Sequence, residues 1–227
     1  MFNPNTLRTR NVVLKRLGIA GLTLLSWLSA PNLDWAQDLS PIVLPAPRLE
    51  GGRPLMQVLQ ARQTVRDFKS NSIPLPMLSD LLWAGFGINR ATNEHRTAPS
   101  AMNSQEIDIY VATAEGVYLY EAKAHQLQPV IPQDIRAKTG GGAFAPVAPV
   151  TLLFVADYAR MPKAKPEQKP VYSAMDAAFI SQNVYLYCAS ERLGTVVHDL
   201  DRAPLLKLLP LGPTQQIVLA QAVGWPK

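Results

Sequence analysis

The sequence predicts an α+β fold, and three of its stretches lead to that prediction. Apolar and polar residues alternate over 107–112, and the turn "AEG" before "VYLY" is typical of a β-hairpin. The stretch "PVTLLFVADY" at 149–158 is apolar almost throughout, as in a strand covered on both faces. Residues 171–192 lack Gly and Pro, which favours a long buried helix. Because helices are mixed with hairpins, α+β is favoured over a strictly alternating βαβ order.

The first 36 residues have the composition of an export signal. A fourteen-residue, largely apolar run at 17–30 follows four basic residues: Arg8, Arg10, Lys15 and Arg16. The run is shorter than the ~20 residues that span a bilayer, so a removed signal is favoured over a stable membrane anchor. The alternative is a buried helix, but the run has no amphipathic stripe. We therefore expect cleavage near Ala36 and export, with the bacterial periplasm as the destination.

The charge of the remaining chain argues against nucleic-acid binding. Without residues 1–36 the chain keeps 18 basic and 16 acidic residues, a net charge of about +2. Its basic clusters are short, such as "KAKPEQK" at 163–169, which reads as a solvated loop. A nucleic-acid binder would present a basic stripe on its folded domain.

Metal and thiol chemistry have little support in the sequence. The single cysteine, Cys188, lies in an apolar helical pattern, which favours packing over a reactive thiol. Three isolated histidines, His95, His125 and His198, form no ligand motif, so we expect no metal site. The glycine-rich stretch "KTGGGAF" at 138–144 lacks the residue order of a phosphate-binding P-loop and reads as a mobile loop.

The chain divides at a proline-rich segment. Residues 37–54 contain four prolines and two glycines, so we interpret them as an extended linker before a domain at 55–227. A short helix is predicted from Leu55 to about Arg62, since Leu55, Val58 and Leu59 share one face. A second helix is predicted over "PMLSDLLWAGFG" at 76–87.

The elements after the long helix are shorter. Gly194 is predicted to cap that helix. A strand at 195–200, a short helix at 202–210 and a last strand at 215–224 follow.

The stretch "RQTVRDF" at 62–68 is a candidate phosphate clamp. In an extended segment Arg62, Thr64 and Arg66 share one side while Val65 faces the core. Guanidinium groups bind phosphate oxygens two at a time, and a hydroxyl between them adds a further donor. The alternative is a set of surface charges in which Arg66 pairs with Asp67.

A second polar stretch precedes the first long strand. In "HRTAPSAMNSQEIDIYVAT", Ser100, Asn103 and Gln105 lie in a loop, where amide side chains can pair with the edge of a heterocycle.

Together the two stretches resemble the nitroreductase-like family of flavin mononucleotide (FMN) enzymes. That family has an R-x-S/T-x-R-x-F stretch and a P-S-x-x-N-x-Q stretch, and both are present at 62–68 and 99–105. The resemblance runs over about 55–225. Within this range, stretches such as "LSDLLWAGFGINR" and "EGVYLYEAKAHQLQPV" are similar to the branch of the family that includes peptide azoline (thiazole/oxazole) dehydrogenases.

The resemblance implies a mixed central sheet flanked by helices, with a long central helix, in an intimate homodimer that binds FMN between subunits. It assigns the phosphate and ribityl side to Arg62, Gln63, Thr64 and Arg66, and the ring to Pro99, Ser100, Asn103 and Gln105. The backbone at Val197, His198 and Asp199 would approach flavin N5 and O4. Lys227 is the one terminal candidate for the phosphate.

The chain also departs from the family pattern. Gln63 replaces a frequent second arginine, Glu106 and Ile107 replace aromatic residues or proline, and the basic C-terminal tail is short. These departures predict weaker cofactor binding.

The resemblance implies an exported FMN-dependent oxidoreductase. It would pass two electrons by a ping-pong mechanism from a reduced donor, with NAD(P)H as a candidate, to a small nitro, quinone or similar acceptor. Because the cofactor carries the chemistry, we assign no catalytic residue. Two alternatives stay open: a degenerate family member that binds flavin or another planar ligand without turnover, and a structural exported domain.

Overall fold

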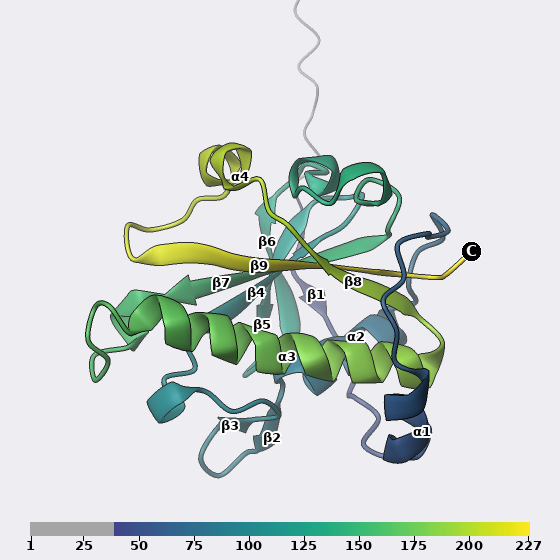
Figure 1. The fold of residues 1–227 in the computed structure, drawn as a ribbon, viewed down its shortest axis with the longest axis horizontal. Coiled ribbons are helices and arrows are strands. Elements are labelled where there is room, and N and C mark those ends of the chain that lie inside the picture. Colours follow the sequence, from purple (N-terminus) through teal and green to yellow (C-terminus); the bar gives the residue numbers. More distant parts are fainter. Residues whose placement is uncertain (1–38) are drawn as a thin grey trace, which may run out of the picture. The chain divides into compact units, whose positions relative to one another are not determined.

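The computed structural model describes residues 39–227, so the predicted signal at 1–36 lies outside the described residues. The strands are β1 (Ile42–Val43), β2 (Ile88–Arg90), β3 (His95–Arg96), β4 (Ile107–Ala112), β5 (Val117–Glu121), β6 (Gln126–Ile131), β7 (Val150–Asp157), β8 (Gly194–His198) and β9 (Gln215–Gly224). The α-helices are α1 (Leu55–Ala61), α2 (Leu75–Phe86), α3 (Lys169–Glu191) and α4 (Arg202–Leu208) (Figure 1). The α+β class is confirmed, and every helix and strand predicted from residue 55 onward is present.

The main sheet is antiparallel, which corrects the expectation of a mixed sheet. Its seven strands have the order β1-β6-β5-β4-β7-β9-β8, and all of the pairings are antiparallel. The helix α3 does connect two strands that run in the same direction, β7 and β8. However, β9 lies between them and pairs with both, so no neighbouring strands are parallel. The sequence analysis did not predict β1, β6 or the separate β2–β3 hairpin.

Helices cover both faces of the sheet, which explains the apolar run at 149–158. On one face, Leu152 and Phe154 pack with α2 and α3 residues, and on the other Leu153 and Val155 pack with α4. All four side chains are fully buried. Figure 1 shows α3 crossing one face, with α4 on the other. Alternate side chains of β7 therefore enter two different core layers.

The cap of the long helix lies slightly earlier than the sequence analysis expected. Arg192, with φ 62°, is the C-terminal cap of α3, and its N–H donates to the Cys188 carbonyl. Gly194 is instead the first residue of β8. Glycine is the usual residue in this left-handed conformation, so an arginine there is unusual.

Residues 39–54 pack on the domain, although the sequence analysis interpreted them as part of a linker. They are largely extended, β1 pairs with β6, and Leu44 is buried in the core. Arg48 joins the segment to two helices through ion pairs with Asp80 (2.9 Å) and Glu191 (3.1 Å). Prolines prevent a helix here but allow short pairing at a sheet edge. The segment is therefore a structural part of the domain.

No helix among residues 39–227 is long and apolar enough to cross a membrane.

Candidate functional site

The extended segment after α1 packs against β8. The Val65 N–H donates to the Thr195 carbonyl at 3.0 Å. A Cβ at position 194 would lie 2.9 Å from Val65 Cγ1, so Gly194 permits this close approach. Because side chains alternate along an extended segment, Arg62 and Thr64 project on the other side from Val65.

Tyr185 of α3 joins this segment to the end of β8. The Arg62 guanidinium carbon lies 5.4 Å from the centre of the Tyr185 ring, and Thr64 Oγ1 lies 3.3 Å from the Tyr185 hydroxyl. The same hydroxyl accepts a hydrogen bond from the Val197 N–H at 3.0 Å. Its own proton therefore stays available for Thr64 or a ligand. Tyr185 was not among the residues predicted from the sequence, because a single aromatic residue within a helix belongs to no motif.

A cavity of about 590 Å³ lies beside this group. It is lined by Arg66, Gly141, Gly142, Phe144, Val197, His198, Asp199 and Leu219. Four of the predicted site residues, Arg66 and the run 197–199, thus come together around one space. Arg66 brings a permanent positive charge to it. The glycine-rich stretch, interpreted from the sequence only as a mobile loop, forms one wall, and its position could not be foreseen from its composition.

His198 is one of the residues that line this cavity, and one of its ring nitrogens is unpaired within the described part of the chain. Nδ1 lies 2.9 Å from the Asp199 carbonyl oxygen, so the proton is on Nδ1. Nε2 is buried and has no hydrogen-bond partner among the described residues. Burial lowers the pKa of His198, although the hydrogen bond to the Asp199 backbone opposes this. The lowered pKa favours the neutral ring, whose Nε2 is an acceptor enclosed by the protein.

The stretch 99–105 forms a strained loop beside α3. Three of its residues, Met102, Asn103 and Gln105, have φ between 49° and 56°. The Gln105 N–H donates to Ser100 Oγ at 2.9 Å, and Gln105 Nε2 donates to Asn103 Oδ1 at 3.3 Å. Such backbone conformations cost about 1–3 kcal/mol each and concentrate at ligand sites. The loop is therefore held in a shape that its local sequence does not favour.

Hydrogen bonds from both sides hold Gln105 in place. Its Oε1 accepts from Arg96 Nε at 2.9 Å, and its Nε2 donates to the Glu94 carbonyl at 3.2 Å. Arg160 donates to the backbone carbonyls of Gln105 (3.1 Å) and Glu106 (2.6 Å). The β2–β3 hairpin and the segment after β7 thus fix this end of the loop.

Directly after the loop, Glu106 is fully buried. Neither of its carboxyl oxygens has a hydrogen-bond partner among the described residues. Burial, reinforced by the negative charge of Asp176, raises its pKa to about 7. Asp176 itself accepts a hydrogen bond from the Ala101 N–H at 2.8 Å, which links this acid pair to the strained loop. The sequence showed Glu106 only as a departure from the family pattern.

The two predicted groups contact different parts of α3. The loop 99–105 contacts Asp176, whereas the arginine segment contacts Tyr185. Asp176 and Tyr185 are nine residues apart on α3. In an α-helix this separation is about 13.5 Å along the axis and about two and a half turns around it. Their side chains consequently point to opposite sides of the helix, and within one chain the two groups stay apart.

Two further predicted residues lie away from the cavity beside His198. Gln63 lines a different cavity, of about 260 Å³, together with Tyr185 and Arg192. Pro99 is exposed at the start of the strained loop. Their assignment to a cofactor stays a prediction.

Lys227 lies beside the arginine segment. Its backbone N–H donates to the Asp67 carbonyl at 3.1 Å, and its Nζ pairs with Asp67 Oδ1 at 2.9 Å. Among the ion pairs of the described residues, none joins Arg66 to Asp67. Arg66 is therefore left for another anion.

The described part of the chain offers little to a metal ion or a thiol reaction. Across residues 39–227, no three or more His, Cys, Asp or Glu side chains form a group that could hold a metal. Cys188 is buried, and burial raises the pKa of its thiol, which makes it unreactive.

Comparison with known proteins identifies relatives over most of the chain. The model described as "Nitroreductase family" matches residues 59–225. A protein designated a nitroreductase in Methanocaldococcus jannaschii is 31% identical over 154 residues, which are 63% of this chain and 76% of that protein. A crystal structure designated a nitroreductase of Ralstonia eutropha JMP134 is 39% identical with a TM-score of 0.79, covering 82% of this chain and 90% of that one.

More distant structures share the fold. A structure designated a nitroreductase in complex with FMN, from Desulfovibrio desulfuricans, is 22% identical with a TM-score of 0.54, covering 78% of this chain and 88% of that one. A chain of the Escherichia coli microcin synthetase McbBCD complex is 16% identical with a TM-score of 0.66, covering 90% of this chain and 85% of that one. The resemblance stated from the sequence is confirmed.

Proposed function

We propose, from the premise that this chain belongs to the nitroreductase family, that it is an FMN-dependent enzyme passing two electrons from a reduced donor to a small acceptor. Family membership makes the chain an oxidoreductase. The related Desulfovibrio desulfuricans structure is a complex with FMN, which supports that cofactor here.

The residues around the cavity fit an anionic, planar cofactor. Arg62 and Arg66 bring two positive charges to one extended segment, and the hydroxyl of Thr64 lies between them. The cavity next to them is lined by Arg66 from this segment and by Val197, His198 and Asp199 from the end of β8. A positively charged side chain and the run predicted to approach the flavin ring are thus brought together around one space. This is the observation that carries the proposal.

Each group has a distinct role in the proposed site. Arg62 and Arg66 bind phosphate oxygens, and Thr64 donates a further hydrogen bond. Tyr185 positions them, since it contacts both Arg62 and Thr64. Bound FMN supplies the two-electron chemistry, while the protein binds it, orients it and favours negative charge on it. No side chain is required as a general acid, so none is assigned.

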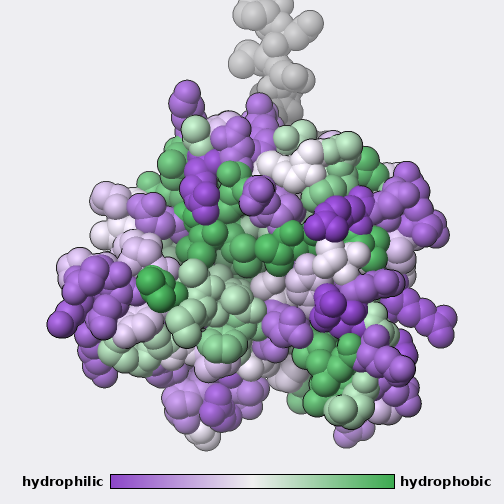
Figure 2. Space-filling view, viewed as in Figure 1, coloured by the Kyte–Doolittle hydropathy of each residue, from purple (hydrophilic) through white to green (hydrophobic). Residues whose placement is uncertain are grey.

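The proposed site is completed by a second copy of the chain. Val171, Met175 and Phe179 form an apolar stripe on α3, spaced four residues apart, and their exposed fractions are 57%, 51% and 46%. Figure 2 shows apolar residues gathered on the side of the molecule that α3 crosses. Apolar patches of this kind mark interfaces. In a homodimer, the strained loop of one subunit would lie against the arginine segment of the other, as the family resemblance implies.

The donor, acceptor and location belong to the proposal. NAD(P)H is the candidate donor, and a small nitro or quinone compound is the candidate acceptor in a ping-pong reaction. The basic residues and apolar run at the N-terminus support export to the periplasm. Fractionation of cells that express the tagged protein tests this part, and a purely cytoplasmic pool would contradict it.

A second candidate is a family member that binds flavin without turnover. Lys227, the terminal cation expected at the phosphate, pairs with Asp67, and Gln63 lines another cavity. Both observations favour weaker cofactor binding.

The absorption spectrum of the purified protein tests the proposed function first. For the wild type at neutral pH, we expect the absorption bands of bound flavin and the release of FMN on boiling. Both signals should be lost in Arg62→Ala and in Arg66→Ala. Leu206→Ala, at an exposed position on α4, serves as the control. Protein that is colourless and cannot be reconstituted with FMN contradicts the proposal. Flavin without turnover, with nicotinamide donors and nitro or quinone acceptors, supports the second candidate instead.

A further inference from the structure

We propose that Glu106 and Asp176 position the loop 99–105 through one shared proton. With the proton, their two carboxyl groups hold the loop in its strained shape, and without it they release the loop. The inference concerns the loop itself and so goes beyond the proposed function. It bears on FMN because the family resemblance assigns residues of this loop to the flavin ring.

The two acids hold opposite ends of the loop. Asp176 of α3 is 3% exposed and accepts a hydrogen bond from the Ala101 N–H, near the start of the loop, at 2.8 Å. Glu106 follows the loop directly and is fully buried just before β4. A bond between the two carboxyl groups therefore joins the start of the loop to its end.

That bond requires a proton. The side chains of Glu106 and Asp176 lie within hydrogen-bonding reach of each other. Two ionised carboxyl groups are acceptors only, which is why neither Glu106 oxygen finds a donor among the described residues. Like charges this close in a buried site disfavour ionisation of both groups. Burial and the charge of Asp176 accordingly raise the pKa of Glu106 to about 7, so the pair gains and loses its proton near neutral pH.

The basic group that contacts Glu106 from the β7 side is already paired with other acids. Arg160 donates to the Glu106 backbone carbonyl at 2.6 Å, but its guanidinium group pairs with Asp108 at 2.7 Å and lies 3.9 Å from Asp157. Among the ion pairs of residues 39–227, none includes Glu106 or Asp176. Ionisation of both acids therefore leaves two adjacent negative charges.

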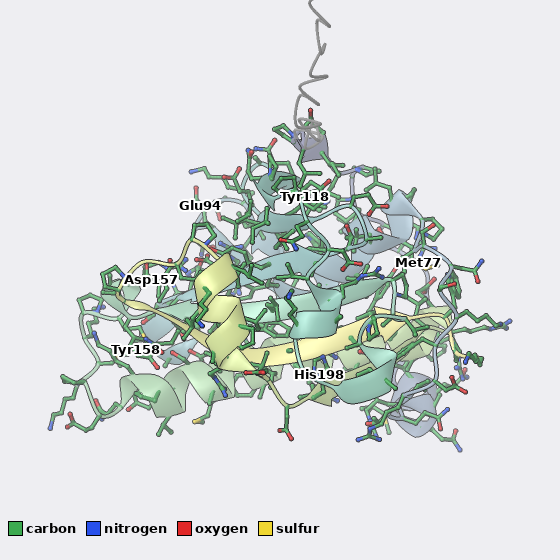
Figure 3. All side chains as sticks on the ribbon, turned by 90° about the horizontal axis from the view of Figure 1, so that it is seen from above. Met77, Glu94, Tyr118, Asp157, Tyr158 and His198 are labelled. Atoms are coloured by element: carbon green, nitrogen blue, oxygen red, sulfur yellow. The ribbon has the colours of Figure 1, made fainter. Side chains whose placement is uncertain are left out.

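Tyr158 is the other titratable group that faces Glu106. The charge of Glu106 contributes to the raised pKa of Tyr158, so this phenol stays neutral near pH 7. Lys169, at the start of α3, donates to the Tyr158 carbonyl at 2.8 Å. Figure 3 shows Asp157 and Tyr158 at the end of the molecule where α3 begins. Neither Tyr158 nor Lys169 removes the repulsion within the pair.

The strain in the loop makes its shape depend on such outside contacts. Left-handed backbone conformations of residues other than glycine persist only where the surrounding structure holds them. Three residues of the loop have φ between 49° and 56°: Met102, Asn103 and Gln105.

The two ends of the loop respond differently to pH. Arg160 holds the Gln105 carbonyl at 3.1 Å, and its charge persists at any relevant pH. The bond from Ala101 to Asp176 has no such permanent partner. Repulsion between the ionised acids therefore acts on the start of the loop, at residues 101–103, while its end stays in place.

Hydrogen exchange of the peptide that covers 99–105, followed by mass spectrometry, tests the inference in the purified full chain. Exchange is measured at pH 6 and pH 8 and corrected for its intrinsic pH dependence. Because a group with a pKa of about 7 keeps its proton in about one molecule in ten at pH 8, we expect protection to fall about tenfold. A β7 peptide from the same digest should stay protected at both pH values, which shows that the fold is intact.

Three variants assign the effect to the acid pair. Glu106→Gln does not ionise and its amide can donate to Asp176, so we expect protection at both pH values. Asp176→Ala removes the acceptor of the Ala101 N–H, so we expect low protection at both. Glu115→Gln, an exposed acid in the turn between β4 and β5, is the matched control and should follow the wild type.

Two results overturn the inference. The first is wild-type protection that is equal at pH 6 and pH 8. The second is a fall in protection that Glu106→Gln still shows, or a loop that stays fully protected in Asp176→Ala.

FMN titration by fluorescence at the same two pH values separates the inference from the proposed function. We expect weaker binding at pH 8 in the wild type but not in Glu106→Gln. A protein that binds no FMN at either pH refutes the proposed function, whereas the exchange result does not depend on FMN. Exchange that is independent of pH refutes the role of the acid pair, whether or not FMN binds.

Discussion

Glu106 gives a sharp prediction, because a fully buried acid beside a second acid, Asp176, must affect stability in a pH-dependent way. Its side chain is fully buried, and its pKa is raised from an ordinary 4.5 to about 7, first by burial and then by Asp176. The folded protein therefore binds a proton that the unfolded chain releases between these two values. Stability contributed by this proton is present at low pH and lost as pH rises from about 4.5 to 7.

The size of the effect follows from the pKa change. One pKa unit corresponds to about 1.36 kcal/mol, so the upper limit for this change is about 3.4 kcal/mol. Water penetration and local rearrangement on ionisation reduce such values, and we expect about 1–2 kcal/mol. Glu106→Gln cannot ionise but keeps a similar size. It should match the wild type at pH 5 and be more stable by that amount at pH 8.

Urea unfolding of both proteins at pH 5, 6, 7 and 8 gives the free energies to compare. The difference between the two proteins reports the acid pair of Glu106 and Asp176, since the pKa values of His125 and His198 are lowered in both and shift both curves equally. Tyr158, whose pKa is raised partly by Glu106, does not titrate in this range. If the two proteins show the same pH dependence, Glu106 does not carry a raised pKa and the reasoning from its burial is refuted.

Three further predictions concern other contacts. Tyr185→Phe leaves the Val197 N–H without its partner and should weaken FMN binding by about 1 kcal/mol; unchanged affinity by fluorescence titration argues against a positioning role. Phe179→Glu should convert a dimer to a monomer in light scattering, whereas Leu206→Glu, also exposed on a helix, should not. Ser79→Ala removes the hydroxyl that donates to the Pro45 carbonyl and contacts His125, both at 2.6 Å. It should lower the free energy of unfolding by about 1–3 kcal/mol, and a smaller loss means that this network does not hold residues 39–54.

Much of the candidate site was visible in the sequence because its residues are close together along the chain. Arg62, Thr64 and Arg66 alternate in a short extended segment, and that spacing alone places them on one side. The residues that complete this surface come from distant elements. Tyr185 and the glycine-rich wall contact the segment only after α3 and β8 have packed, and neither belongs to a local pattern.

By itself, the sequence determined the α+β class and the long helix, because apolar periodicity records which side of an element is buried. It also determined the family, through two motifs of fixed spacing. Only the tertiary structure decided that the sheet is antiparallel throughout, since the position of β9 between β7 and β8 depends on pairing between distant strands. It likewise decided that Glu106 is buried and that His198 Nε2 is buried without a partner among the described residues. Burial and hydrogen-bond pairing are properties of neighbours in space, which no local pattern of residues specifies.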